Sequence, residues 1–92
     1  MDQVNSSDVL RYRYRPDILT ALLEHGLKPL PTTSPDQVRL ALRDLYRFEI
    51  RRLRDRLVRG DIPKAGYADR VVELRHKYPL LSLPVRFWLE PD

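Results

Sequence analysis

The sequence predicts a mainly α-helical fold: a short helix, a long central helix and an antiparallel third helix, with extended apolar arms at both ends. Two observations lead to this prediction. The stretch between Ser34 and Gly60 has a helix start, a helix stop and no Gly or Pro after Pro35. Apolar residues also recur every three or four positions on both sides of Gly60, as they do in amphipathic helices.

The central helix is bounded by capping residues. Ser34 can accept a hydrogen bond at the N-cap, Pro35 suits the first helical position, and Gln37 completes a capping box. Gly60 favours the left-handed conformation that ends helices. About 25 residues at roughly 1.5 Å each predict a rod on the order of 37 Å long.

This helix has more apolar surface than one neighbouring helix would cover. The apolar positions form two stripes, rotated by roughly a quarter turn, that together cover about half of the circumference. We therefore expect a central helix that is contacted from two sides. The first stripe comprises Val38, Ala41, Leu42 and Leu45, with Phe48 at its margin, and the second comprises Tyr46, Ile50, Leu53 and Leu57.

The N-terminal part predicts a tail and then an extended segment. Residues 1–8 lack periodicity, and we expect them to form a flexible tail. Residues 9–15 alternate between arginines and apolar or aromatic side chains, which favours an extended conformation. Pro16 also biases the residue before it away from helix.

A short helix and a connector precede Ser34. Pro16 and Gly26 bracket a helix over about residues 16–25, and residues 27–33 contain two prolines that stiffen the connector. The expected apolar face of this helix comprises Ile18, Leu19, Leu22 and Leu23.

A third helix is expected from about Pro63 to Tyr78, because its apolar residues are spaced by three and four positions. The short loop after Gly60 makes this helix the antiparallel neighbour of the central one. We expect Ile50, Leu53 and Leu57 on the central helix to pack against Tyr67, Val71 and Leu74.

Residues 80–92 predict an apolar arm broken by two prolines. We expect this arm to be extended and packed on the hairpin, with one helical turn near Phe87. The sequence leaves open whether it pairs with the extended segment at residues 11–15.

Composition limits the chain to one small domain, residues 1–92, whose marginal core would benefit from oligomerisation. There is no apolar run near 18 residues, and the polar start gives no signal peptide, so we expect a cytoplasmic protein without membrane contact. The chain has no cysteine, which excludes disulfides and thiolate chemistry.

The sequence offers no catalytic constellation. It has two histidines and three glycines, too few for a histidine metal site or a glycine-rich phosphate loop. His25 and His76 lie near the expected C-terminal ends of helices, where a protonated imidazole interacts favourably with the helix dipole. We expect a non-enzymatic protein with no cofactor or metal, and no small-molecule substrate is evident.

Glu49 is unusual because it falls between Tyr46 and Leu53, inside the apolar surface, where an unpaired carboxylate is costly to bury. One interpretation is a partly buried ion pair with Arg52 or Arg56 that fixes the position of the helix. The other is a contact in which a second chain supplies the partner of the carboxylate.

The excess of positive charge lies on the central helix. This helix has eight arginines against four acidic residues, which accounts for the whole net charge of +4. A ridge of four arginines, with Arg39 at its edge, could bind nucleic-acid phosphates without reading sequence. Most charged helix faces only meet water, so a solvated face is the competing interpretation. The ridge comprises Arg43, Arg47, Arg51 and Arg54.

Large aromatic residues near the chain ends suggest protein–protein contact. Such residues are hard to bury entirely within 92 residues, and aromatics together with arginine are typical of interface centres. The alternative is that the terminal arms use them to cover the second apolar stripe. They are Tyr12, Tyr14, Phe87 and Trp88.

The hairpin turn resembles a known family. Residues 57–62 read Leu-Val-Arg-Gly-Asp-Ile and are followed by Tyr67, Val71 and Leu74, a pattern that resembles the SHOCT-type short helical hairpin. In that family an acidic residue usually precedes the aromatic, where this chain has Gly66. The resemblance covers residues 57–74, and it implies an appended module associated with oligomerisation.

From these observations we expect a helical protein–protein interaction module that self-associates, as a dimer, or binds another protein. The alternative function is nucleic-acid binding through the arginine ridge of the central helix.

Overall fold

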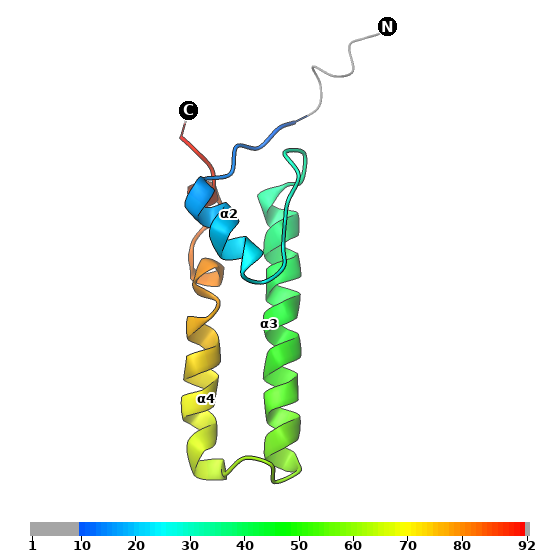
Figure 1. The fold of residues 1–92 in the computed structure, drawn as a ribbon, viewed down its shortest axis with the longest axis vertical. Coiled ribbons are helices and arrows are strands. Elements are labelled where there is room, and N and C mark those ends of the chain that lie inside the picture. The colour runs from blue at the N-terminus through cyan, green and yellow to red at the C-terminus, as the bar shows by residue number, and fades with distance from the viewer. Residues whose placement is uncertain (1–9, 92) are drawn as a thin grey trace, which may run out of the picture.

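Residues 10–91, which the computed structural model describes, fold into three α-helices followed by two short 3-10 helices (Figure 1). α3 and α4 run antiparallel, and α2 lies against one end of this hairpin. The predicted mainly α-helical fold is confirmed, and residues 10–91 contain no β-sheet. The elements are α2 (Pro16–Leu23), α3 (Pro35–Val58), α4 (Lys64–His76), η1 (Pro79–Ser82) and η2 (Val85–Trp88).

α3 is the unbroken rod that the capping residues predict, and its 24 residues span about 36 Å. Ser34 and Gln37 form the reciprocal capping box at its start. Gly60 has a φ of +81° at its end. There the amide of Gly60 donates to Leu57 and the amide of Asp61 donates to Arg56, the hydrogen-bond pair of a Schellman motif. This motif turns the chain into α4.

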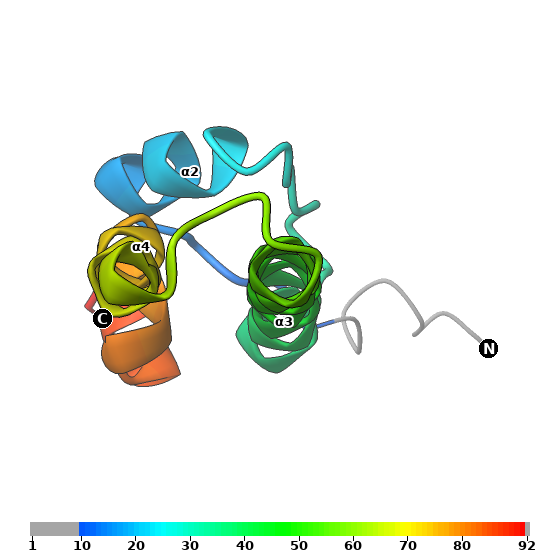
Figure 2. The ribbon, with the colours of Figure 1, turned by 90° about the horizontal axis from the view of Figure 1, so that it is seen from below.

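The best-packed part of the core lies at the α2 end of the hairpin. Leu22, Leu42 and Trp88 are the largest fully buried side chains, and they come from α2, α3 and η2. Figure 2 shows α2 on one side of the plane of α3 and α4 and the C-terminal segment on the other. The indole Nε1 of Trp88 donates to the carbonyl oxygen of Leu83 at 3.1 Å, so this buried donor is satisfied.

The extended N-terminal segment pairs with the C-terminal arm, which resolves the alternative that the sequence left open. Tyr14 and Leu89 form an antiparallel bridge. The amide of Arg15 donates to Trp88 at 2.9 Å, and the amide of Glu90 donates to Arg13 at 2.8 Å. The predicted alternation holds from residue 11 to residue 15, where the arginines are exposed and the tyrosines face the core.

Several expected boundaries need correction. The third helix ends at His76 rather than Tyr78, because Pro79 disfavours the helical conformation in the residue before it. The helical turn expected near Phe87 is present as η2, but residues 80–91 are less extended than expected because a second turn, η1, begins at Pro79. α2 ends at Leu23. The expected tail at residues 1–8 lies outside the described residues.

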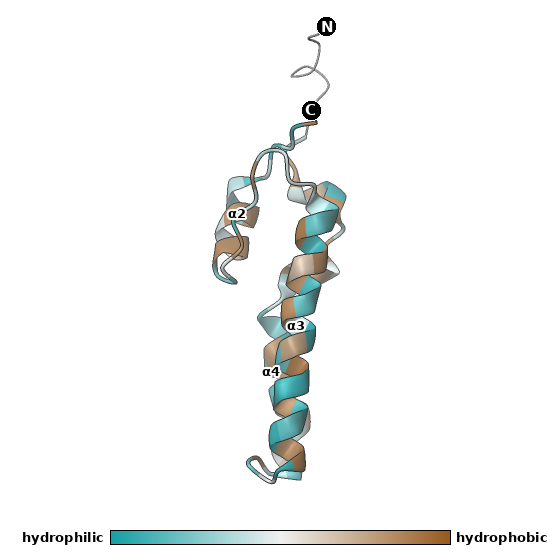
Figure 3. Cartoon of the chain, turned by 90° about the vertical axis from the view of Figure 1, so that its right-hand side faces the viewer, coloured by the Kyte–Doolittle hydropathy of each residue, from teal (hydrophilic) through white to brown (hydrophobic). Residues whose placement is uncertain are grey.

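Within residues 10–91, only α3 and α4 extend from α2 and the C-terminal arm toward the turn, one behind the other in Figure 3. Leu53 and Leu74 are buried between α3 and α4, and Ile62 is buried in the turn. Ile50, Leu57, Tyr67 and Val71 along this half of the hairpin are only half-buried, and Val58 and Val72 are exposed. Within residues 10–91, none of the helices combines the length and the apolar character needed to cross a membrane.

Candidate functional site: the two faces of the α3–α4 hairpin

Glu49 and Tyr78 meet where the two-helix part of the hairpin begins. The Tyr78 side chain is 3% exposed, and its hydroxyl donates to Oε2 of Glu49. The Tyr78 ring also stacks on His25, with centroids 4.2 Å apart, and meets the edge of Tyr46 at 5.3 Å. Burial, followed by the hydrogen bond to Glu49 and its negative charge, raises the pKa of Tyr78 above its usual value. Tyr78 thus connects α3 to the end of α4 and to the residues after α2.

The expected ion pair between Glu49 and Arg52 or Arg56 does not form. Within residues 10–91 the ion pairs closer than 4.0 Å are Arg15–Asp17 and Arg59–Asp61. The guanidinium of Arg52 lies over the Phe48 ring, 5.8 Å from its centroid. Instead, the carboxylate of Glu49 accepts a hydrogen bond from the hydroxyl of Tyr78, which belongs to the same chain.

Helix spacing alone does not reveal Tyr78 as the partner of Glu49, but the hairpin register could have done so. Leu53 and Leu74 face each other across the two helices. Glu49 lies four residues before Leu53, and Tyr78 lies four residues after Leu74. In an antiparallel pair, equal steps in opposite directions reach facing positions, so Glu49 comes opposite Tyr78. The sequence left this register open, because Leu53 was expected to pack against Tyr67, Val71 or Leu74 without a choice among them.

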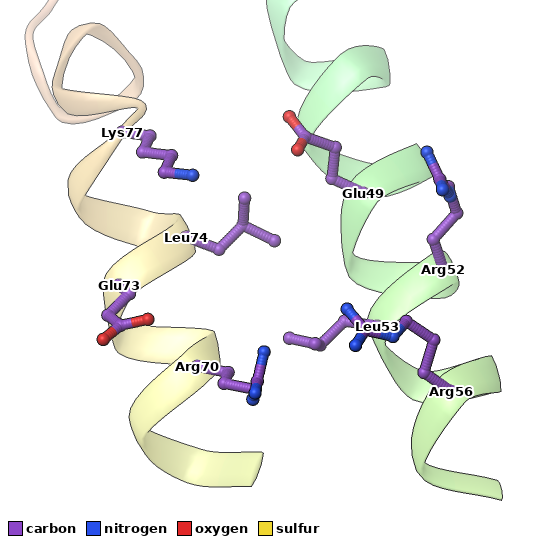
Figure 4. A pocket seen from close by; sticks show the side chains of 8 residues that line it. All are labelled: Glu49, Arg52, Leu53, Arg56, Arg70, Glu73, Leu74 and Lys77. Atoms are coloured by element: carbon purple, nitrogen blue, oxygen red, sulfur yellow. The ribbon is translucent and has the colours of Figure 1, made fainter. Parts of the chain in front are cut away.

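A polar pocket of about 270 Å³ lies along the same seam (Figure 4). Figure 4 shows the side chains of Arg56, Arg70 and Lys77 directed into the space between the helices, whereas Arg52 lies on the outer side of α3. Arg56 is half-buried and Arg70 and Lys77 are exposed. The pocket is lined by Glu49, Arg52, Leu53, Arg56, Arg70, Glu73, Leu74 and Lys77.

The other face of the two-helix part is apolar. Successive residues of a helix point about 100° apart, which puts Ile50 and Leu57 on the side of α3 away from the pocket-lining arginines. The same spacing puts Val71 on the side of α4 away from Arg70 and Glu73. We call this surface the open flank. It comprises Ile50, Leu57, Tyr67 and Val71, all half-buried.

The arginine ridge is exposed, and within residues 10–91 none of its four members forms an ion pair closer than 4.0 Å. Arg39, expected at the edge of the ridge, has a different role. Its Nη2 donates to the carbonyl oxygen of Leu81 at 2.7 Å and its Nη1 to that of Leu83 at 3.4 Å, so Arg39 holds the C-terminal arm against α3. The ridge members are Arg43, Arg47, Arg51 and Arg54.

The four aromatics expected at an interface have different environments. Trp88 is fully buried and Tyr14 is buried, so the expectation that the chain cannot cover them is wrong for these two. The Tyr14 hydroxyl donates to the carbonyl oxygen of Thr33, and burial, with a smaller contribution from Tyr12, raises the pKa of Tyr14 to about 12. Tyr12 is half-buried. Phe87 remains 46% exposed, beneath the guanidinium of Arg86.

No group of three or more His, Cys, Asp or Glu side chains that could hold a metal occurs within residues 10–91. His25 is half-buried against Tyr78, and His76 is exposed at the end of α4. Comparisons with family models, with curated proteins and with solved structures found no match. The resemblance of residues 57–74 to the SHOCT-type hairpin therefore stays a prediction.

Proposed function

We propose that this protein is a non-enzymatic helical interaction module that self-associates through the open flank of the α3–α4 hairpin. The observation that supports the proposal is the uneven burial along α3. Near α2, Leu42 is fully buried between several elements. Nearer the turn, Leu57 is only half-buried, although it continues the apolar surface of the same helix, and Ile50 is half-buried at the edge of the core cluster.

A second copy of the chain is the occupant that fits this flank best. Its hairpin offers a two-helix face of the same length with the same apolar spacing. Two such faces related by a two-fold axis would form a four-helix bundle, an arrangement that buries inward apolar positions on all four helices. A 92-residue chain also has a small core, so additional burial through association would raise its stability.

Light scattering at several hundred micromolar tests self-association directly. We expect a mass of about twice 10.9 kDa, falling toward the monomer on dilution. Leu57→Gln should shift the protein to the monomer, because it places an amide in the apolar interface. Val58→Gln is the matched control, since Val58 follows Leu57 but is 80% exposed.

Circular dichroism must show native helix content for the Leu57→Gln variant, and Val71→Gln provides a second disruption from α4. A wild-type protein that remains a monomer at the highest concentration would overturn the proposal. So would an equal loss of mass in the Leu57→Gln and Val58→Gln variants.

Nucleic-acid binding is the second candidate, supported by the exposed arginine ridge. Its first and last members, Arg43 and Arg54, are eleven residues apart, or about 16 Å along α3. This length would let the ridge follow several phosphates of one backbone. Because the ridge arginines form no ion pair within residues 10–91, binding would not have to break existing pairs.

Salt dependence tests this second candidate. If the ridge binds phosphates, affinity for DNA or RNA should fall steeply between about 50 and 200 mM salt. The Arg47→Gln, Arg51→Gln double variant should reduce the slope of log K against log salt by about two. The Arg75→Gln, Arg86→Gln double variant carries the same charge change elsewhere and should leave the slope nearly unchanged. Absence of binding at low salt would exclude the ridge as a nucleic-acid site.

A further inference from the structure

Three cationic side chains converge on the pocket face of the hairpin. Arg56 comes from α3, Arg70 comes from α4, and Lys77 follows directly after α4. Figure 4 shows Arg56 and Arg70 extending toward one another from opposite helices, with the Lys77 side chain directed into the same space nearer Glu49. Arg56 is half-buried, so part of its hydration is lost in this position.

The three cations have no close ionic partner among the described residues. Within residues 10–91, none of the three forms an ion pair closer than 4.0 Å. Glu49 lies at one end of the pocket and accepts its hydrogen bond from Tyr78. Glu73 also lines the pocket, so the three convergent cations share it with two carboxylates. Two guanidinium groups that face each other repel, and a bound anion would relieve this repulsion.

We propose that this pocket is a binding site for the phosphate groups of a small polyanion, held by Arg56, Arg70 and Lys77. A phosphate group carries up to two negative charges near neutral pH, so it matches three convergent cations better than a single carboxylate. The planar guanidinium donors of the two arginines suit the paired oxygens of phosphate. Leu53 and Leu74 form the apolar part of the pocket lining. The volume of about 270 Å³ is large enough for inorganic pyrophosphate.

The pocket is separate from both surfaces of the proposed function. The open flank lies on the other face of the hairpin, and the arginine ridge lies on the solvent side of α3. Pyrophosphate binding should therefore persist in the Leu57→Gln variant, so a failure of self-association would leave this proposal untouched.

Calorimetric titration of the full chain with inorganic pyrophosphate, at ionic strength held constant with NaCl, tests the site. Replacing both Arg56 and Arg70 by Gln should weaken binding by roughly tenfold or more, since charge-assisted contacts are the stronger hydrogen bonds. Lys77 is exposed, so Lys77→Gln should leave the fold intact and weaken binding by a few-fold. This single variant still tests the site if the double variant does not fold. Replacing Arg43 and Arg47 by Gln makes the same change in net charge outside the pocket and should have little effect.

Glu49 provides an independent test with the opposite sign. Glu49→Gln removes a negative charge from the end of the pocket, so pyrophosphate should bind a few-fold more tightly. Asp44→Asn makes the same charge change on the exposed side of α3 and should not alter the affinity. The proposal is overturned if the Arg43/Arg47 and Arg56/Arg70 double variants weaken binding equally. It is also overturned if pyrophosphate does not bind at all, or if citrate binds as tightly as pyrophosphate.

Discussion

The contact between Tyr78 and Glu49 yields the sharpest stability prediction. Tyr78→Phe removes the hydroxyl that donates to Glu49 and leaves the ring in its buried position against His25 and Tyr46. A hydrogen bond to a charged group contributes about 1.5–3 kcal/mol when both partners are shielded from water. Glu49 is only half-buried and can regain water, so we expect Tyr78→Phe to lower the free energy of unfolding by about 1–2 kcal/mol.

A double-mutant cycle separates this contact from other effects of the substitutions. The cycle combines Tyr78→Phe with Glu49→Ala and measures the free energy of unfolding by urea titration followed by circular dichroism at 222 nm. We expect a coupling energy of about 1 kcal/mol between the two positions. A second cycle combines Glu49→Ala with Arg52→Ala. Its coupling should stay below about 0.5 kcal/mol, because exposed helix pairs contribute little even when they do form.

The two cycles show whether the partner of Glu49 is Tyr78, as in the structure, or Arg52, as helical spacing suggests. A coupling near zero between Tyr78 and Glu49, together with about 1 kcal/mol or more between Glu49 and Arg52, would refute Tyr78 as the partner of the carboxylate. Equal denaturant dependence of all variants is needed for the comparison, since a changed slope indicates an altered unfolded or native state.

Three further predictions concern Tyr14, Arg39 and the two glycines of the hairpin. Burial raises the pKa of Tyr14 to about 12, so its contribution to stability is complete below about pH 10 and is lost as the pH rises toward 12. Between about pH 10 and 12, the free energy of unfolding of the Tyr14→Phe variant should therefore decrease less steeply with pH than that of the wild type, by about 1.4 kcal/mol per pH unit. Denaturant titrations measure this dependence, and the same pH dependence in both proteins would contradict the prediction. Arg39→Gln should lower the free energy of unfolding by about 1–2 kcal/mol and shift Trp88 fluorescence, because it loosens the C-terminal arm. Arg43 is exposed and lies one turn away, so Arg43→Gln should change the free energy of unfolding by less than about 0.5 kcal/mol. Gly60→Ala should lower the free energy of unfolding by about 1 kcal/mol because Gly60 has a positive φ. Gly66→Ala inside α4 should raise the free energy of unfolding by about 0.5–1 kcal/mol. Changes of the same sign in the two variants would contradict the hairpin geometry.

The helices were predictable from the sequence because their signals are local. Ser34 and Gln37 form the capping box that their spacing predicts, and Gly60 adopts the left-handed conformation that ends α3. Each of these choices depends on hydrogen bonds within a few residues. The predicted end of α4 is two residues too late because the apolar spacing continues to Tyr78. Pro79 disfavours the helical conformation of Tyr78, so the helix ends before it.

The environment of the side chains was less predictable because it depends on contacts between distant segments. Helical spacing favours an arginine of the same helix as the partner of Glu49, but the partner comes from a residue 29 positions later. The same spacing places Arg39 beside the exposed ridge, but this arginine binds carbonyl groups more than 40 residues away. The size of Trp88 indicates a residue that is hard to cover, but α2 and α3 meet the C-terminal arm around it. No spacing rule within one helix contains this information.

The open flank follows from the lengths of the elements. α3 is about 36 Å long, whereas the eight residues of α2 span only about 12 Å and each four-residue 3-10 helix spans about 8 Å. These short elements all gather at one end, where they bury Leu22, Leu42 and Trp88 completely. Within residues 10–91, the remaining length of α3 has α4 as its only long neighbour. A helix that stays apolar on this second half therefore carries more apolar surface than its own fold covers, and a second copy of the hairpin would supply the missing layer.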